Sequence, residues 1–181
     1  TLGLPKPANF FFLACLSFYI LCCTLKIHPS IGILGSLAFA YATYNALIIA
    51  AGHDTKMLVI SYMPALMAGL LLIYHKKYWI GLALSIIAGY WVVGFNHPQI
   101  TYYFVIAFGI ITLGYIFTWI KQKEWKHFAI SLSLAAVAAI ASLANSAITL
   151  ITTAEYSKYT MRGGKSIETS GSEIIKAETK G

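Results

Sequence analysis

The chain reads IITLGYIF from Ile110 to Phe117, and this run decides its fold. Its apolar side chains follow one another without alternation, whereas strands of a transmembrane β-barrel alternate apolar and polar residues. The run lies inside an apolar stretch over about residues 100–120, within the roughly 17 to 25 residues that cross a hydrocarbon core as a helix. Because a helix satisfies its own backbone hydrogen bonds in lipid, we predict a membrane-spanning helix here.

Similar apolar stretches occur throughout the chain. They cover about residues 9–25, 31–51, 57–74, 79–95, 100–120 and 128–151. Hydrophobic residues make up 59% of the 181 residues and charged residues 10%, against roughly 25% charged in soluble domains. We therefore predict an all-α fold, a polytopic transmembrane helical bundle with about six spans. Small residues over 135–142 in the last span favour close helix packing.

The ends of the chain suggest an excerpt. The first residue is Thr1 rather than Met, and the residues after Ser166 are polar without a periodic apolar face. We expect an interior fragment of a longer protein, with a transmembrane region over 1–154. A polar tail over 155–181 is then extracytoplasmic, and is either the start of a following segment or disordered.

Lysines sort the loops into two sets. The first, third and fifth spans are followed by Lys26, by Lys76 and Lys77, and by Lys121, Lys123 and Lys126. The loops after the second and fourth spans carry only Lys56. Because short cytoplasmic loops accumulate Lys and Arg, the first set is expected to be cytoplasmic and the loops at 52–56 and 96–99 extracytoplasmic. The net charge of +7 thus reflects topology, and no nucleic-acid partner is expected.

The loop at 52–56 reads GHDTK and combines His53, Asp54 and Lys56. An imidazole, a carboxylate and an ammonium at a membrane boundary can carry a proton, act as a base and hold an anion. Asp54 can equally serve as a cap for the following helix. We take His53 and Asp54 as candidate catalytic residues and Lys56 as a candidate substrate-binding residue.

The loop at 96–99 reads NHPQ. Pro98 suits the first turn of a helix, whose free N–H groups attract phosphate. Gln99, Tyr102 and Tyr103 have i, i+3, i+4 spacing and share a helix face. A plain helix start with interfacial tyrosines is the competing interpretation. His97 joins the catalytic candidates, and the substrate-binding candidates from this loop are Asn96, Gln99, Tyr102 and Tyr103.

Two further substrate-binding candidates follow the last span, Glu155 and Arg162. A guanidinium next to a glycine pair can hold a phosphate, although a plain aromatic membrane exit explains the same residues. No metal site is predicted, since His53, Asp54 and His97 match no recognised ligand spacing. A divalent cation carried in by a phosphate-bearing substrate is the one cofactor left open.

The ordered motifs together resemble a known family. They are AGHDTK at 51–56, YMP at 62–64, NHPQITYY at 96–103, EYSKY at 155–159 and RGG at 162–164. This set resembles the YfhO family of bacterial multi-spanning membrane proteins, of the Bacteroidetes type, over about residues 1–168. The resemblance implies a C-type glycosyltransferase whose active site faces outward. Such enzymes usually carry a catalytic acidic residue in a large first outer loop, which this chain lacks, so Asp54 becomes a secondary candidate.

The resemblance leads to one functional expectation. A membrane glycosyltransferase would transfer sugar from a polyprenyl-phosphate donor to a cell-envelope acceptor, outside the bacterial inner membrane. Lys56, Arg162 and the helix start at Pro98 would neutralise the donor phosphate. Gln99, Tyr102 and Tyr103 would hold sugar hydroxyls, and Asp54 with His53 or His97 would assist proton transfer.

The same residues are also consistent with two other classes of function. A transporter or lipid flippase would use the same polar boundaries as a path for an anion, and a non-catalytic subunit would pack into a larger membrane complex. The expected partners are membrane lipid, the sugar donor, and the remainder of the parent chain or other membrane subunits.

Overall fold

The structure, a computed structural model, describes residues 4–157. It divides into two units, Thr1–Ser146 and Ala147–Gly181. The helices of the first unit are α1 (Ala8–Thr24), α2 (Pro29–Ala40), α3 (Thr43–Ala50), α4 (Asp54–Tyr74), α5 (Tyr78–Gly94), α6 (Pro98–Lys121) and α7 (Trp125–Asn145). The described part of the second unit is α8 (Ala147–Ser157).

The prediction of an all-α membrane protein is confirmed. Residues 4–157 contain helices and no strand. Four stretches are long and apolar enough to cross a membrane: Pro29–Ala50, Asp54–Tyr74, Pro98–Lys121 and Trp125–Asn145. Two shorter apolar helices are Ala8–Thr24 and Tyr78–Gly94. Together these stretches correspond to the six predicted from hydropathy.

The second stretch is not one continuous helix. It breaks between α2 and α3, where the side-chain amide of Asn45 donates to the carbonyls of Phe39 at 2.8 Å and Ala40 at 3.1 Å. These carbonyls belong to the end of α2, where helix carbonyls have no partner within the helix. The buried Asn45 side chain therefore stabilises the break.

The sixth stretch also differs from the prediction of one span over 128–151. Helix α7 starts earlier, at Trp125, and ends at Asn145. Helix α8 begins at Ala147 and runs to Ser157, past the expected end of the helical region at residue 154. Ser146 separates them and is the last residue of the first unit.

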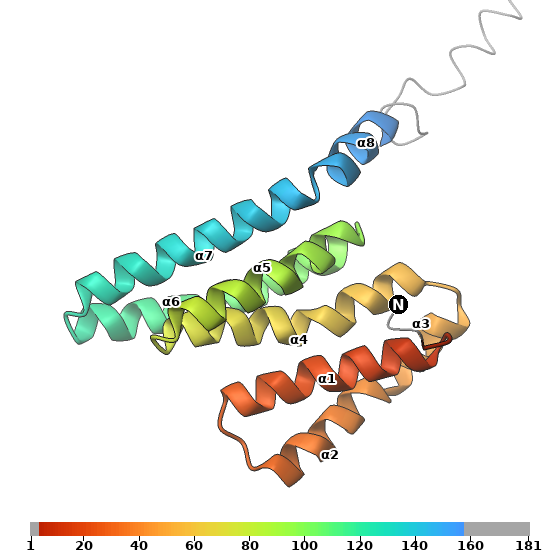
Figure 1. The fold of residues 1–181 in the computed structure, drawn as a ribbon, viewed down its shortest axis with the longest axis horizontal. Helices are drawn as coiled ribbons and strands as arrows, with labels where there is room; N and C mark the ends of the chain where they lie inside the picture. The colour runs from red at the N-terminus through yellow and green to blue at the C-terminus, as the bar shows by residue number, and fades with distance from the viewer. Residues whose placement is uncertain (1–3, 158–181) are drawn as a thin grey trace, which may run out of the picture. The chain divides into compact units, whose positions relative to one another are not determined.

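Helix α4 lies at the centre of the first unit, in contact with α1, α3, α5, α6 and α7 (Figure 1). Fifty-six per cent of its span is buried, against 11% of the α6 span. Glycines let α5 approach closely, since a Cβ added at Gly81 would lie 2.6 Å from the backbone nitrogen of Ile73. The expected packing role of residues 135–142 is met in part by Ala138 and Ser142, which are buried.

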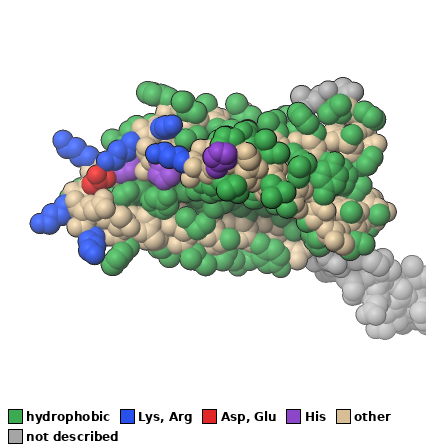
Figure 2. Space-filling view, turned by 90° about the horizontal axis from the view of Figure 1, so that it is seen from below, with side chains coloured by type: hydrophobic (Ala, Val, Ile, Leu, Met, Phe, Trp, Pro, Cys, Tyr) green, Lys and Arg blue, Asp and Glu red, His purple; other side chains and the backbone are tan. Residues whose placement is uncertain are grey.

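Successive spans reverse direction, so the loops of the first unit gather at two ends (Figure 1). We call the end with residues 52–56 and 96–99 the island end. The opposite end is the basic end, with Lys26, Lys76, Lys77, Lys121, Lys123 and Lys126. Figure 2 shows Lys side chains gathered at this end of the drawn face, beyond a largely hydrophobic surface.

Candidate functional site

The two polar loops at 52–56 and 96–99, which we call the first and second island, lie at the same end of the first unit. Helix α4 begins at Asp54 and α6 begins at Pro98. Because α5 runs back along α4, the loop before α4 and the loop after α5 lie at one end (Figure 1). His53 and His97 occupy equivalent positions, each directly before the first residue of its helix.

Asp54 does not cap α4. Its carboxylate pairs with the ammonium of Lys6, and no side chain among the described residues forms a capping hydrogen bond at this helix start. The ion pair ties the segment before α1 to the start of α4. The acidic candidate is thus held next to a cation, while His53 is exposed.

Lys56 lies over an aromatic ring. Its Nζ is 5.1 Å from the ring centroid of Tyr44, at the start of α3. This distance is typical of a cation–π contact, which leaves the ammonium able to receive further acceptors. The contact fixes Lys56 at the island end, as an anion-binding role requires.

The second island contains an unusual histidine. The Nδ1 atom of His97 is buried and has no hydrogen-bond partner among residues 4–157. Its backbone carbonyl accepts from the N–H of Thr101 at 3.3 Å, which starts α6. Asn96 precedes it in the left-handed region, with φ of 52°. The backbone of His97 is therefore held by the helix start, while its Nδ1 has no polar partner in the described part of the chain.

The helix face predicted beyond His97 is present. The amide of Gln99 donates to the hydroxyl of Tyr103 at 3.1 Å. Tyr102 and Tyr103 are exposed, and their ring centroids lie 6.1 Å apart. Amide and phenol groups on one open face can hydrogen-bond to sugar hydroxyls.

Aromatic rings connect α4 and α5 near this end. The ring of Tyr62 stacks on Trp91 at 5.8 Å and lies 6.1 Å from Phe95. From the sequence, Tyr62 has no expected role beyond its place in the YMP motif. The stack holds the two helices that carry the island loops against one another.

The remaining candidates are outside the first unit of the chain. Glu155 is exposed on α8, in the second unit, and Arg162 lies outside the described residues. Within residues 4–157, no group of three His, Cys, Asp or Glu side chains is arranged to hold a metal ion. The structure thus brings the candidates of the 52–56 and 96–99 loops to one end of the first unit, and Glu155 belongs to the second unit.

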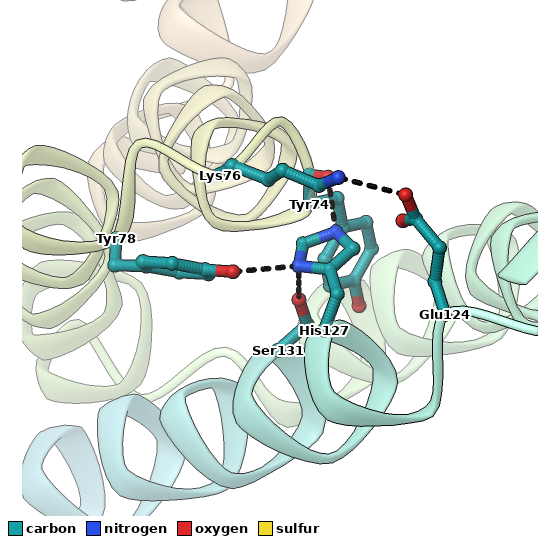
Figure 3. A network of polar contacts seen from close by, with 6 residues as sticks. All are labelled: Tyr74, Lys76, Tyr78, Glu124, His127 and Ser131. Carbon is teal, nitrogen blue, oxygen red and sulfur yellow. Dashed lines mark hydrogen bonds and ion pairs between the residues drawn. The ribbon is translucent and has the colours of Figure 1, made fainter.

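A buried polar network at the basic end was not anticipated from the sequence (Figure 3). His127 of α7 is 6% exposed. Its Nε2 lies 2.9 Å from the carbonyl of Tyr74, the last residue of α4, and its Nδ1 lies 2.8 Å from the hydroxyl of Tyr78. Because a carbonyl only accepts, Nε2 carries the proton. His127 thus satisfies a helix-end carbonyl of α4.

Two neighbours extend this network. The hydroxyl of Ser131, one turn along α7, lies 3.2 Å from Nδ1 of His127. Above the ring, the ammonium of Lys76 donates to Glu124 at 2.8 Å. This hydrogen bond lowers the pKa of Glu124 and raises the pKa of Lys76. The network joins the α4–α5 and α6–α7 turns.

One sequence signal pointed to this network. His127 and Ser131 are spaced i, i+4 and share a helix face. The two tyrosines are about 50 residues earlier in the chain, so spacing alone does not reveal them.

Comparison with known proteins adds no assignment: no family model matches the chain, and no curated protein or solved structure is significantly similar to it.

Proposed function

We propose that the chain is part of a membrane glycosyltransferase and that its island end receives a polyprenyl-phosphate sugar donor. One observation carries the proposal, the buried Nδ1 of His97 without a partner among the described residues. A buried polar atom without a hydrogen bond costs free energy, and a ligand that supplies the partner is a common explanation.

The surroundings of His97 suit a phosphate. The first N–H groups of a helix have no partner within the helix, and no side chain in the described part of the chain caps α6. Such a helix start binds anions. Lys56 supplies a cation at the same end, and Gln99 with Tyr103 supplies groups for sugar hydroxyls.

The roles follow from this arrangement. His97 accepts or returns a proton, Lys56 and the start of α6 neutralise the departing lipid phosphate, and Asp54 with Lys6 keeps the α4 start in place. Fixed charges next to a developing anion lower the barrier more than solvent does. Asp54 and His53 act in support, since the family resemblance puts the principal acidic residue in an upstream loop.

The test is sugar transfer by the complete protein in proteoliposomes. We expect His97→Ala to lower turnover about 100-fold, as removal of a proton-transfer group does. Lys56→Ala is expected mainly to raise KM for the donor. His28→Ala is the matched control, because His28 precedes Pro29 at a helix start as His97 precedes Pro98, but at the basic end. Equal turnover for His97→Ala and His28→Ala would refute the role of His97. No sugar transfer by the unaltered protein would refute the glycosyltransferase and would favour a non-catalytic subunit.

A further inference from the structure

A cavity of about 720 Å³ lies at the basic end, between the last turns of α1 and α4 and the outer half of α6. The polar side chains among its lining residues are Tyr19, Thr24, Lys26, His75, Lys77 and Tyr115. None of the candidate residues of the island end lines it. The inference drawn from it does not rest on the proposed function.

The cavity has a positive lining. Lys26 and Lys77 are among its lining residues and Asp and Glu are not. Neither lysine has an acidic partner within residues 4–157, where the ion pairs are Lys6–Asp54 and Lys76–Glu124. Lys76, directly before Lys77, is turned to Glu124 instead. The two unpaired ammonium groups therefore favour an anion.

Hydrogen-bonding groups accompany the charges. Nε2 of His75 lies 3.0 Å from the hydroxyl of Tyr115. This contact joins the end of α4 to α6 at the wall of the cavity. This pair keeps one N–H or O–H donor beyond its mutual hydrogen bond, which can contact a phosphate oxygen, whereas the Thr24 hydroxyl donates to the carbonyl of Ile20 at 3.0 Å. A phosphate needs several donors of this kind because it presents several acceptor oxygens.

An apolar groove shares one lining residue with the cavity. Tyr19 lines both the cavity and a second space of about 220 Å³ between α1 and α2. The other residues of this groove include Phe12, Leu16 and Ile33, which are exposed apolar side chains. A cationic cavity next to an apolar groove has the two-part chemistry of a phospholipid.

We propose that this cavity binds the phosphate headgroup of an anionic phospholipid, with Lys26 and Lys77 as its cationic contacts and one acyl chain in the α1–α2 groove. Basic pockets between transmembrane helices on the cytoplasmic side bind such headgroups. The lipid would bridge α1 and α4 where the two helices end.

The test uses the complete protein in a mild neutral detergent, titrated with dioleoyl phosphatidylglycerol or dioleoyl phosphatidylcholine. Cys23 is exposed and lines the cavity, so its alkylation rate, followed by mass spectrometry, reports occupancy. We expect phosphatidylglycerol to slow alkylation several-fold and phosphatidylcholine to have little effect. Equal protection by both lipids would overturn the proposal, and so would full protection by inorganic phosphate alone.

Charge variants locate the site. Lys26→Gln with Lys77→Gln is expected to weaken phosphatidylglycerol binding about 25-fold, roughly fivefold for each lysine. Lys121→Gln with Lys126→Gln is the matched control, with the same charge change at the same end but outside the cavity lining. Equal weakening by both pairs would mean diffuse attraction and would contradict the proposal. If the double variant at Lys26 and Lys77 does not fold, the alkylation assay on the unaltered protein tests the lipid-binding proposal by itself.

Discussion

At the basic end, helices α1, α4 and α6 are followed by Lys26, Lys76 and Lys123 in the left-handed region, with φ of 57°, 65° and 58°. At the island end, the same kind of turn uses Gly52 and Asn96, with φ of 76° and 52°. Glycine and asparagine adopt this conformation most readily, whereas other residues are strained there by about 1 kcal/mol. Lysines at the basic end thus occupy positions that are conformationally unfavourable for them.

The difference has an electrostatic explanation. A cation near a helix C-terminus interacts favourably with the helix dipole. Loop lysines also favour the cytoplasmic side of a membrane. The basic end therefore combines charge with a buried network that holds its turns. The island end combines relaxed turns with a histidine whose Nδ1 has no hydrogen-bond partner among residues 4–157. The basic end is thus the end with more internal polar contacts, and the island end is the one at which we propose that the sugar donor binds.

The largest expected effect is the difference in unfolding free energy between variants of His127 and His97. His127→Ala leaves the Tyr74 carbonyl and the Tyr78 and Ser131 hydroxyls without their buried partner, and should lower the free energy of unfolding by about 2 to 4 kcal/mol. His97→Ala removes a ring whose Nδ1 has no partner in the described chain, and should cost less than about 1 kcal/mol. Thermal unfolding of both variants in one detergent provides the measurement. Equal losses of unfolding free energy in the two variants would contradict the claim that buried contacts hold the basic end more firmly than the island end.

A smaller effect concerns the turns themselves. Gly52→Ala should destabilise the protein by about 1 kcal/mol from backbone strain alone, because an added Cβ meets nothing within 4 Å. Lys123→Gly should have the opposite sign and stabilise it by about 0.5 kcal/mol, since glycine relieves the strain but loses more chain entropy. The same unfolding assay measures both changes. Destabilisation by Lys123→Gly would show that the charge outweighs the strain.

The smallest effect is a pH dependence at the basic end. The hydrogen bond from Lys76 lowers the pKa of Glu124, so the stabilisation by this pair is present above the usual carboxyl pKa and is lost as the pH falls through the lowered value. Lys76 has its pKa raised by the same contact, so its share is lost only at strongly alkaline pH. Glu124→Gln should therefore lower Tm slightly at pH 7 and have no effect well below about pH 4. A Tm difference that persists in acid would contradict the pairing.

Hydropathy was sufficient to predict the helical membrane fold and the six apolar stretches, because length and apolarity alone determine which segments can cross a hydrocarbon core. It also predicted the grouping of the islands, since alternating spans return to the same end. Hydropathy did not predict the break between α2 and α3. That break depends on Asn45 bonding back to two carbonyls, a contact that an apolar average does not register.

For the candidate sites, too, the sequence predicts local features but not long-range contacts. The residues of the NHPQ segment could be selected because helix starts have local sequence signals. The His127 network could not, since Tyr74 and Tyr78 approach it only through packing of α4 and α5 against α7. Local patterns identify helix ends, and long-range partners require the fold.

Labelling of single cysteines in intact cells tests the two-ended account most directly. In a background with Cys15, Cys22 and Cys23 changed to serine, Thr55→Cys and Gln99→Cys report on the island end and Lys123→Cys on the basic end, all at exposed positions. We expect a membrane-impermeant maleimide to label positions 55 and 99 from outside, and position 123 only after permeabilisation. Labelling of position 123 from outside, or opposite behaviour of positions 55 and 99, would contradict it.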